Sequence, residues 1–371
     1  MLYFAGAILH KTSSACEGLN FVIDIFFYLM NPREKFIHTI QGTNTGAPIF
    51  CPAIYNYKAT FSRVPMHLFG MKEEELIDAM GKEIDSLQTE VVTCGYDIYN
   101  VEAEALGSKV NRSQANVFPE ITESLITDLE DIDHKLPSLK EPAGRMPVYI
   151  HATKKISEQF QHQVYARGVV SGPFSLAGAL YDNEKLIMDC MINQQGVYKL
   201  LEYCTQTIIT YINGFIDEGQ DVVVFDSLAS PPLVSPELYN DLIFPFHQQI
   251  FDHLIKRQVQ IRPLIMGGNT LAVLEKLAQT GANQLLLDYN IPLKEARQAL
   301  EKYDMAFRIN IDPSLVAYSN QNQIAAQLEK VFNFLGHSSN LLIGTGILAN
   351  DTPLENIQYI NNCIIDWYKQ S

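Results

Sequence analysis

Polar residues recur along this chain where apolar runs end, and their types are those that handle substrates in enzymes. Asp97, Asp226 and Ser227 each stand at the end of a β-rich apolar run. A carboxylate there holds a cationic nitrogen or moves a proton, and a hydroxyl orients a neighbouring group. The other polar or small residues at run ends are Tyr55, Tyr57, Lys58, Tyr96, Tyr99, Gly172, Pro173, Gly267, Gly268, Asn269, Asp288, Tyr289, Asn310, Asp312 and Thr345.

These residues need a scaffold that brings the run ends together. Alternation of short apolar runs with helical segments predicts parallel strands joined by helices, and eight such units predict a single-domain α/β fold, the (β/α)8 TIM barrel. In that fold the active site forms at the carboxyl ends of the strands. The eight runs lie at 48–55, 89–99, 164–172, 221–228, 260–268, 283–290, 305–313 and 340–346, and we interpret 108–150 as a long excursion between the second and third.

Each polar residue also has an ordinary structural interpretation. Asp97 either acts on a substrate or caps the next turn through backbone N–H groups. The same alternative holds for Asp226, where the proline-rich segment that follows favours capping. Asp312 precedes Pro313 and is typical of a helix start. Lys58 is either an anion anchor or an ion-pair partner.

The charge and the cysteine pattern narrow the classes of partner. The 371 residues include 27 Lys and Arg against 42 Asp and Glu, a formal net charge of -15. Such a chain lacks the cluster of cations that nucleic acid or an anionic membrane surface would need. The six cysteines form no Cys-x-x-Cys pair, so we expect a reducing cytoplasm. The nine histidines do not cluster, so no metal site is predicted.

Residues 1–29 stand apart from the rest of the chain. The run LNFVIDIFFYLM is apolar but short, is interrupted by Asp24, and lacks a basic n-region before it and an A-x-A-like cleavage site after it, so it predicts neither a signal peptide nor a membrane span. Asn31, Pro32 and Glu34 form a helix start just beyond it. We therefore expect an extension of doubtful relevance at 1–29, either a start-site overrun or a loosely attached element, and a barrel at 30–371.

Taken in order, the segments at the run ends resemble the uroporphyrinogen decarboxylase superfamily, which includes the decarboxylase of haem synthesis and the cobamide:thiol methyltransferases. The resemblance begins near Met30 and rests on seven collinear stretches: MNPREKF, GYDIYNVEAEALG, SGPFSLAGAL, VFDSLASPPLVSPELY, GGNTLAVLEKLAQTGA, INIDPSLV and GTGILANDTPLENI. It implies a barrel enzyme whose cavity faces a tetrapyrrole or corrinoid. Homodimers occur in the family, so a homodimer is one possible assembly.

VEAEALG, GNT and DTPLENI are similar to the methyltransferase branch. Members of that branch carry zinc on a His-x-Cys pair before GNT and on a Cys before TPLENI, and the zinc lowers the pKa of an acceptor thiol. The matching positions here are Ile265, Gly267 and Gly346. The resemblance therefore predicts that the zinc ligands are lost. What remains is a tight turn capped by Asn269 or, alternatively, a short anion-binding loop at Gly267 and Gly268.

The decarboxylase branch matches in part. Its aspartate that binds pyrrole N–H groups corresponds to Asp97, and its serine on the fourth strand corresponds to Ser227. Its Arg-Gln-Ala-Gly-Arg run after the first strand corresponds to AIYNYK, where Lys58 is the only cation. Its tyrosine and its histidine correspond to Ala179 and Thr345. Decarboxylation of uroporphyrinogen is therefore the less favoured interpretation.

Three functions stay open at this point. The favoured one is a corrinoid-linked methyltransferase relative without zinc-thiolate chemistry, acting on a small methyl acceptor, with the corrinoid bound as a substrate or carried by a partner protein. The second is a decarboxylase of a porphyrinogen or a smaller pyrrole carboxylic acid, and the third is a non-catalytic corrinoid- or partner-binding barrel. Asp97 and Ser227 are the predicted catalytic residues. The predicted substrate contacts are Tyr57, Lys58, Tyr96, Phe174, Asp226, Gly267, Gly268, Asn269, Asp288, Asn310 and Thr345.

Overall fold

The computed structural model describes residues 30–114, 117–335 and 338–370, so the extension predicted at 1–29 lies outside the described residues. Eight parallel strands form one sheet in the order β1-β10-β9-β8-β7-β6-β5-β2, and the two end strands contact each other, which nearly closes the barrel. The strands are β1 (Ile49–Ala53), β2 (Val91–Cys94), β5 (Tyr165–Ser171), β6 (Val222–Phe225), β7 (Pro263–Ile265), β8 (Gln284–Leu287), β9 (Ala306–Ile311) and β10 (Leu341–Ile347). All eight coincide with predicted runs, so the predicted single-domain (β/α)8 barrel is confirmed.

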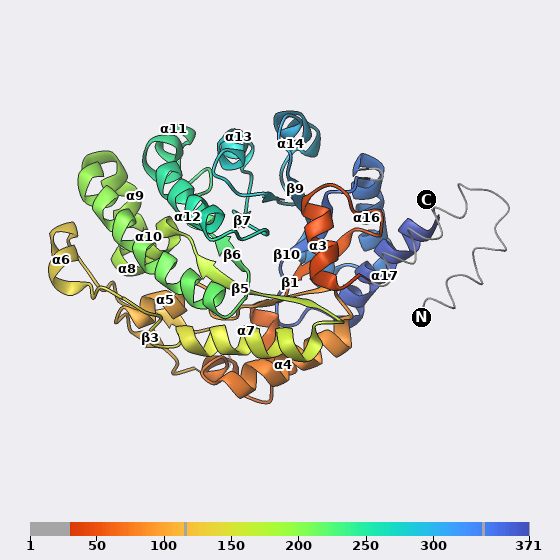
Figure 1. Ribbon diagram of the computed structural model, residues 1–371, viewed down its shortest axis with the longest axis horizontal. Helices are drawn as coiled ribbons and strands as arrows, with labels where there is room; N and C mark the ends of the chain where they lie inside the picture. The colour runs from red at the N-terminus through yellow and green to blue at the C-terminus, as the bar shows by residue number, and fades with distance from the viewer. Residues whose placement is uncertain (1–29, 115–116, 336–337, 371) are drawn as a thin grey trace.

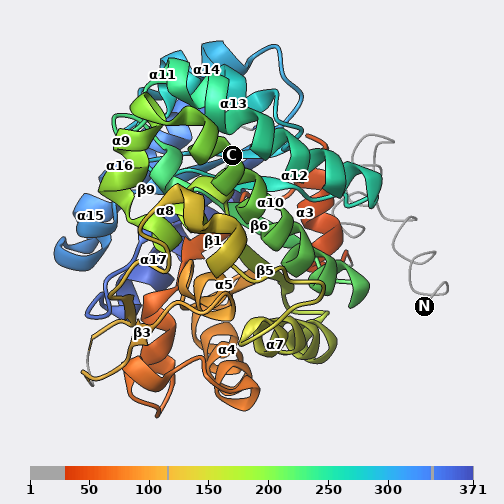
Figure 2. The same ribbon diagram turned by 90° about the vertical axis from the view of Figure 1, so that its left-hand side faces the viewer.

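Helices cover the outside of the barrel (Figure 1). Contacting pairs lie around the sheet: α4 with α7, α10 with α12, and α16 with α17 (Figures 1 and 2). The α-helices are α3 (Pro32–Ile40), α4 (Glu73–Leu87), α5 (Asn100–Ala105), α6 (Ile132–Lys135), α7 (Met146–Phe160), α8 (Pro173–Tyr181), α9 (Asn183–Ile192), α10 (Gln194–Asp217), α11 (Pro236–Leu238), α12 (Phe244–Lys256), α13 (Leu274–Ala278), α14 (Leu293–Leu300), α15 (Pro313–Tyr318), α16 (Gln321–Leu335) and α17 (Leu354–Gln370).

Short elements fill the connections. Among the described residues, the 3-10 helices are η2 (Asn56–Phe61), η3 (Met66–Leu68), η4 (Leu129–Asp131), η5 (Ser227–Ala229) and η7 (Leu271–Val273), and a π-helical stretch, η6 (Tyr239–Ile243), joins α11 to α12. The excursion predicted at 108–150 holds a two-stranded hairpin, β3 (Val110–Asn111) with β4 (Glu120–Ile121), then η4 and α6. Along the chain, the excursion lies between β2 and β5.

Two helix starts follow the local sequence signals. The Asn31 side chain accepts a hydrogen bond from the Glu34 backbone N–H, and the Glu34 carboxylate accepts one from the Asn31 N–H, so α3 begins with a capping box. Asp312 caps α15 by accepting from the Ser314 N–H at 2.8 Å. The structural interpretation of Asp312 is thereby confirmed.

The barrel interior is layered because alternate residues of each strand point inward. An apolar cluster fills the lower end and includes Tyr165 and Ala306, while a second apolar cluster near the upper end includes Val169. Arg167 lies between Tyr165 and Val169 on the inward face of β5, and Arg308 occupies the equivalent place on β9. Both arginines are buried. The middle of the barrel is therefore polar and carries two cations.

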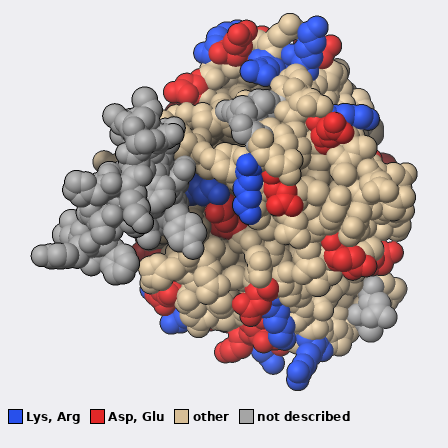
Figure 3. Space-filling view, turned by 90° about the vertical axis from the view of Figure 1, so that its right-hand side faces the viewer, with Lys and Arg blue, Asp and Glu red and all other residues tan. Residues whose placement is uncertain are grey.

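Figure 3 shows how charged side chains are distributed over one face of the molecule. On the coloured part of the face in Figure 3, acidic and basic side chains lie close to one another in several places. Many of the described ion pairs join side chains that are partly exposed, such as Lys302 with Glu275 and Arg257 with Asp217. This distribution agrees with the acidic net charge of -15.

Candidate active site

A cavity of about 440 Å³ opens at the carboxyl ends of the strands. Its wall is mostly aromatic and aliphatic, with a few polar groups at its base, which is the usual composition of a small-molecule site. The residues that line it are Ala53, Tyr55, Asn56, Tyr96, Ile98, Tyr99, Phe118, Phe225, Ser227, Ile265, Gly267, Leu286, Asp288, Tyr289, Arg308, Asn310, Pro313, Thr345, Gly346 and Ile347. We call it the main cavity.

A chain of polar contacts forms the floor of the main cavity. Arg308 donates from Nε to Asn310 Oδ1 at 3.1 Å and from Nη2 to the Thr345 carbonyl at 2.9 Å. Asn310 in turn donates from Nδ2 to Asp288 Oδ1 at 2.9 Å. The amide of Asn310 therefore stands between the guanidinium and the carboxylate.

Two further contacts hold the carboxylate of Asp288. The Gly268 N–H donates to its Oδ2 at 2.7 Å, and the Tyr289 N–H donates to its Oδ1 at 3.0 Å. Together with the bond from Asn310, these contacts hold the Asp288 side chain in one position at the floor of the main cavity.

The corner after β7 is a tight turn. Gly268 has a φ of 82°, which a residue with a side chain rarely adopts, and its neighbour Gly267 donates to Ser227 Oγ at 3.3 Å. The exposed Asn269 accepts from the Leu271 N–H at 3.2 Å, ahead of η7. Of the two interpretations of this segment, the turn agrees with these contacts, since its two glycine N–H groups are used within the protein.

Tyr99 and Ser227 separate the main cavity from a second hollow of about 530 Å³, which both residues also line. The backbone φ of Tyr99 is 76°, uncommon for a residue with a side chain. Burial raises the pKa of the Tyr99 hydroxyl to about 12, against the opposing effect of hydrogen bonding with Ser227. Tyr99 therefore stays protonated at neutral pH and presents an O–H group at this wall.

Asp226 lies behind that wall and performs a structural task. Its carboxylate accepts from the Phe174 N–H at 3.2 Å, and from the N–H and Oγ of Ser175 at 2.7 and 2.6 Å, at the start of α8. His247 Nε2 lies 2.8 Å from Asp226 Oδ2, and the Tyr239 hydroxyl lies 2.9 Å from His247 Nδ1. The capping interpretation of Asp226 agrees with this buried network.

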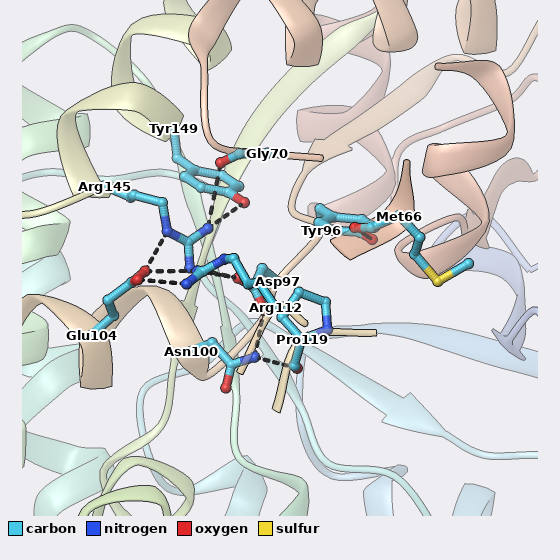
Figure 4. A network of polar contacts seen from close by, with 10 residues as sticks. All are labelled: Met66, Gly70, Tyr96, Asp97, Asn100, Glu104, Arg112, Pro119, Arg145 and Tyr149. Carbon is cyan, nitrogen blue, oxygen red and sulfur yellow. Dashed lines mark hydrogen bonds and ion pairs between the residues drawn. The ribbon is translucent and has the colours of Figure 1, made fainter. Parts of the chain in front are cut away.

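Asp97 belongs to an ion-pair network beside the main cavity (Figure 4). Its Oδ2 lies 2.5 Å from Arg145 Nη2 and 3.6 Å from Arg112 Nη2, and Asn100 donates to its Oδ1. Glu104 binds both arginines, with 2.7 Å to Arg112 and 2.5 Å to Arg145. Although burial opposes it, hydrogen bonding to Arg112 and the charge of Arg145 lower the pKa of Glu104. The charges in this network compensate one another.

Lys58 is buried in an ion pair with Glu83 of α4. It does not line the main cavity, nor does the neighbouring Tyr57, which packs edge-on against Phe61 with ring centroids 5.7 Å apart. Burial raises the pKa of Glu83, against the opposing charge of Lys58. Of the two interpretations of Lys58, the ion pair is the one that the structure contains.

The predicted site residues divide into two groups. Six line the main cavity: Tyr96, Ser227, Gly267, Asp288, Asn310 and Thr345. The others lie behind its wall or at its rim: Tyr57, Lys58, Asp97, Phe174, Asp226, Gly268 and Asn269. Their roles in catalysis or binding stay predictions.

Sequence reasoning missed Arg308, the cation of the cavity floor, and Phe118, which the excursion contributes to the wall. A signal for Arg308 exists in the segment AFRINIDP, where it stands two residues before Asn310. Residues two apart in a strand share a face, so an inward Asn310 requires an inward Arg308. Phe118 has no comparable signal, because its place depends on the path of a long loop.

Two general features of the described residues bear on cofactors and membranes. Over 30–114, 117–335 and 338–370, no group of three or more His, Cys, Asp or Glu side chains comes together in a way that would hold a metal ion. In the same ranges, none of the helices combines the length and the apolar character that crossing a bilayer requires.

Sequence comparisons match the chain to one family almost from end to end. The family model described as Uroporphyrinogen decarboxylase (URO-D) matches residues 31–367. A methylcobamide:CoM methyltransferase, MtbA of Methanosarcina mazei, is 26% identical over 276 residues, which are 74% of this chain and 79% of that protein. The uroporphyrinogen decarboxylase of Trichormus variabilis is 27% identical over 229 residues, 59% of this chain and 63% of that protein.

Among solved structures, a methyltransferase from Methanosarcina mazei has the same fold. It superposes with a TM-score of 0.81 and covers 91% of this chain and 99% of its own, at 19% sequence identity. At that identity the likeness supports the barrel architecture and leaves the chemistry to the residues of the cavity.

Proposed function

Because the chain belongs to the uroporphyrinogen decarboxylase family, as a barrel enzyme related to both the methyltransferases and the decarboxylases, we propose that it is a corrinoid-linked methyltransferase. In this proposal a small acceptor binds in the main cavity and takes a methyl group from a corrinoid at the cavity mouth. The corrinoid is either a free substrate or the cargo of a partner protein. The proposal rests on the lining of the main cavity, in which aromatic and aliphatic side chains surround a few polar groups.

The zinc of the methyltransferase branch does not fit the residues present here. The three positions that correspond to its ligands, Ile265, Gly267 and Gly346, all line the main cavity, so the correspondence is geometrically consistent. None of them carries a sulfur, imidazole or carboxylate ligand. A Cβ at position 346 would lie 2.7 Å from Pro313, so a cysteine there would need the neighbouring backbone to move. We therefore propose an acceptor whose reaction does not depend on zinc at this place.

The charge of the lining favours an acceptor much smaller than a porphyrinogen. Uroporphyrinogen carries eight carboxylates, whereas Arg308 is the one cation among the described residues that line the main cavity. Unpaired carboxylates would lose their hydration inside a largely apolar wall, which costs several kcal/mol each, about 2–7 kcal/mol or more for a polar group without a partner. A small acceptor avoids that cost.

Methyl transfer needs an acceptor held in line with the donor, and its proton must be removed. A lone pair of the acceptor forms the bond to the methyl carbon, while the electrons of the cobalt–carbon bond stay with the corrinoid. Asn310 and Asp288 lie at the floor of the main cavity, where they would orient the acceptor. Asp288 would also accept the proton that the acceptor releases. Ser227 and the Tyr99 hydroxyl stand at the side wall.

A second candidate is decarboxylation of a porphyrinogen or of a smaller pyrrole carboxylic acid. It is favoured by the correspondence of Asp97 and Ser227 to residues of the decarboxylase branch. However, the side chain of Asp97 is fully buried and ion-paired with Arg145, so its charge is compensated before a substrate enters. For that reason we place methyl transfer first, with Asp97 as a positioning residue.

The two proposals are separable by titration and turnover. The purified protein is titrated with methylcobalamin, hydroxocobalamin and an oxidised porphyrin by absorbance, and its metal content is determined on the same sample. We expect corrinoid binding without stoichiometric zinc, and loss of the methylcobalamin spectrum when a suitable acceptor is added. Turnover of a porphyrinogen, detected by oxidation and chromatography, would support the decarboxylase instead. Corrinoid binding with no turnover across an acceptor panel would support a non-catalytic barrel.

A further inference from the structure

We propose that Arg308 is the anion-binding residue of the main cavity, and that the substrate held there is a small molecule with one carboxylate or similar singly charged oxyanion. This inference deepens the proposed function and rests on it for the use of the main cavity as the acceptor site. It names the residue of this chain that would hold the charge of the acceptor.

The first argument is that the charge of Arg308 is buried without a counter-ion in contact. Arg308 is 2% exposed, and among the described residues no carboxylate lies within ion-pair distance of it. Buried charges in folded proteins are normally paired, because desolvation costs several kcal/mol per ion. A buried cation that lacks a carboxylate partner and borders a cavity is suited to an anion that enters from the cavity.

The second argument concerns the hydrogen-bonding capacity of the guanidinium. A guanidinium has five N–H donors. In the described structure Arg308 donates to Asn310 and to the Thr345 carbonyl, and the Tyr55 hydroxyl is a further neighbour. These neighbours are neutral and number fewer than the donors, so the guanidinium has N–H groups available to a ligand.

The arrangement of Asn310 keeps the nearest acid from neutralising this cation. Its Oδ1 accepts from Arg308, and its Nδ2 donates to Asp288. The carboxylate of Asp288 is therefore one side chain away from the guanidinium and is held there by the Gly268 and Tyr289 N–H groups. Asn310 separates a cationic half of the floor from an anionic half.

A second buried cation below the floor strengthens the positive potential. Arg167 donates to Thr93 and to the Cys51 sulfur, and its Nη1 is buried without a hydrogen-bond partner among the described residues. Its guanidinium also lies 5.3 Å from the ring centroid of Phe36. Two cations without carboxylate contacts thus stand inside a barrel whose protein has a net charge of -15. Their field favours an anion at the floor.

The backbone is shaped to hold Arg308 in this place. A Cβ built on Gly344 of β10 would lie 2.2 Å from Arg308 Nε, and 2.8 Å from both Asn310 Oδ1 and the backbone carbonyl oxygen of Cys51 on β1, distances below those of real Cβ contacts. Gly344 pairs with Asn310 across the sheet, so the glycine and the polar pair share one layer of the barrel. Even an alanine at position 344 would displace the guanidinium.

The shape of the Arg308 guanidinium and the side chains of the cavity wall indicate the chemistry of the ligand. The planar guanidinium matches the two oxygens of a carboxylate, as it does in other arginine–oxyanion pairs. The wall above it includes Tyr96, Phe118 and Phe225, which suit a short apolar body. One available cation accommodates one anionic group, and further charges on the ligand would stay unpaired.

The test compares two probes of the same shape. Propanoate and the neutral propanamide are titrated against the full chain, with binding followed by ligand-observed NMR and by the shift in melting temperature. We expect propanoate to bind at least about tenfold more tightly than propanamide, and Arg308→Gln to weaken propanoate binding by about tenfold or more. Equal binding of the two probes, or unchanged binding in Arg308→Gln, would overturn the proposal.

Two further variants, compared per folded molecule, test whether the loss is specific to Arg308. Arg167→Gln removes the second guanidinium inside the barrel, which does not line the main cavity, so we expect a smaller loss of propanoate binding than in Arg308→Gln. Gly344→Ala keeps the charge but displaces it, and we expect binding to fall. A larger loss in Arg167→Gln than in Arg308→Gln would contradict the assignment to Arg308.

The failure of this inference is distinguishable from the failure of the proposed function. Propanoate binding that depends on Arg308, in a protein that transfers no methyl group from methylcobalamin to any acceptor, would contradict methyl transfer and leave the anion site standing. Methyl transfer to a neutral acceptor at an unchanged rate in Arg308→Gln would contradict the anion site and leave methyl transfer standing.

Discussion

Two buried arginines near the main cavity differ in what surrounds them. Arg145 lies between Asp97 and Glu104, at 2.5 Å from each carboxylate (Figure 4), whereas Arg308 contacts an amide and a backbone carbonyl. The protein itself neutralises the first charge and leaves the second to the cavity. The difference teaches that a buried charged side chain marks a binding site when the protein provides no opposite charge for it. When carboxylates of the protein already pair with it, the side chain connects parts of the structure.

The two arginines also differ in the elements that carry them. Arg145 precedes α7, at the end of the long excursion, and ties that segment to α5 through Glu104. Arg308 is on β9 inside the barrel, where its backbone is fixed by pairing with both neighbouring strands. A fixed backbone suits a residue that must hold a ligand in one orientation.

The largest effect on stability is expected from Asp97→Ala, which breaks the complete network. It leaves Arg145 with one counter-ion and Arg112 without its second, and removing one partner of a buried pair costs about 3–5 kcal/mol. Urea denaturation measures the loss. Propanoate binding per folded molecule should be retained. If methyl transfer per folded molecule is also retained, the predicted catalytic role of Asp97 is contradicted.

The Lys58→Met variant should lose about 3 kcal/mol of its free energy of unfolding, because the substitution leaves Glu83 buried without its cation. Burial already raises the pKa of Glu83 above its model-compound value of 4.5, and removing Lys58 raises that pKa further. The folded state then binds more protons than the unfolded state above pH 4.5, so the variant should lose stability as the pH rises.

The control for this pair is the double variant Lys58→Met, Glu83→Leu. With both charges replaced by apolar side chains, the double variant should regain most of the stability that Lys58→Met loses. Its stability should also lose the extra dependence on pH. Denaturation midpoints at pH 5.5 and pH 8 compare the wild-type protein with the two variants. A double variant less stable than Lys58→Met would show that the unpaired charge of Glu83 is not the source of the lost stability.

An intermediate effect is expected at the positions that correspond to zinc ligands. Gly346→Ala should cost about 1–3 kcal/mol because its Cβ would approach Pro313 to 2.7 Å. Gly267→Ala should change stability by less than about 0.5 kcal/mol, since the nearest atoms to its Cβ are 3.6 Å away. Thermal denaturation of both variants tests which of them loses more stability. A larger loss in Gly267→Ala than in Gly346→Ala would contradict the described packing.

A small net effect on stability is expected from Arg308→Met, although its side chain is buried. The variant loses two hydrogen bonds of about 1 kcal/mol each but also removes the desolvation cost of an unpaired buried charge, and these terms oppose each other. We expect a net change within about 1 kcal/mol, with loss of the propanoate-induced rise in melting temperature. A destabilisation as large as that of Asp97→Ala would mean that Arg308 also stabilises the folded structure.

The sequence predicted the barrel because alternation of apolar runs and helices reflects local chemistry. Run ends also identified Asn310, Asp288 and Ser227, since a polar side chain at the end of a buried strand has few places to point. Asp97 was identified as a polar residue at the end of the second strand run, but its partner Arg145 is 48 residues away in a loop of irregular path. Such a pairing is set by tertiary packing, which no local pattern encodes.

The central claim is tested most directly by a crystal structure of the full chain grown with propanoate. The account predicts a carboxylate in the main cavity with its oxygens about 2.7–2.9 Å from the Arg308 guanidinium nitrogens, as in charge-assisted pairs. Propanoate bound elsewhere on the protein, or a main cavity without propanoate at saturating concentration, would contradict it.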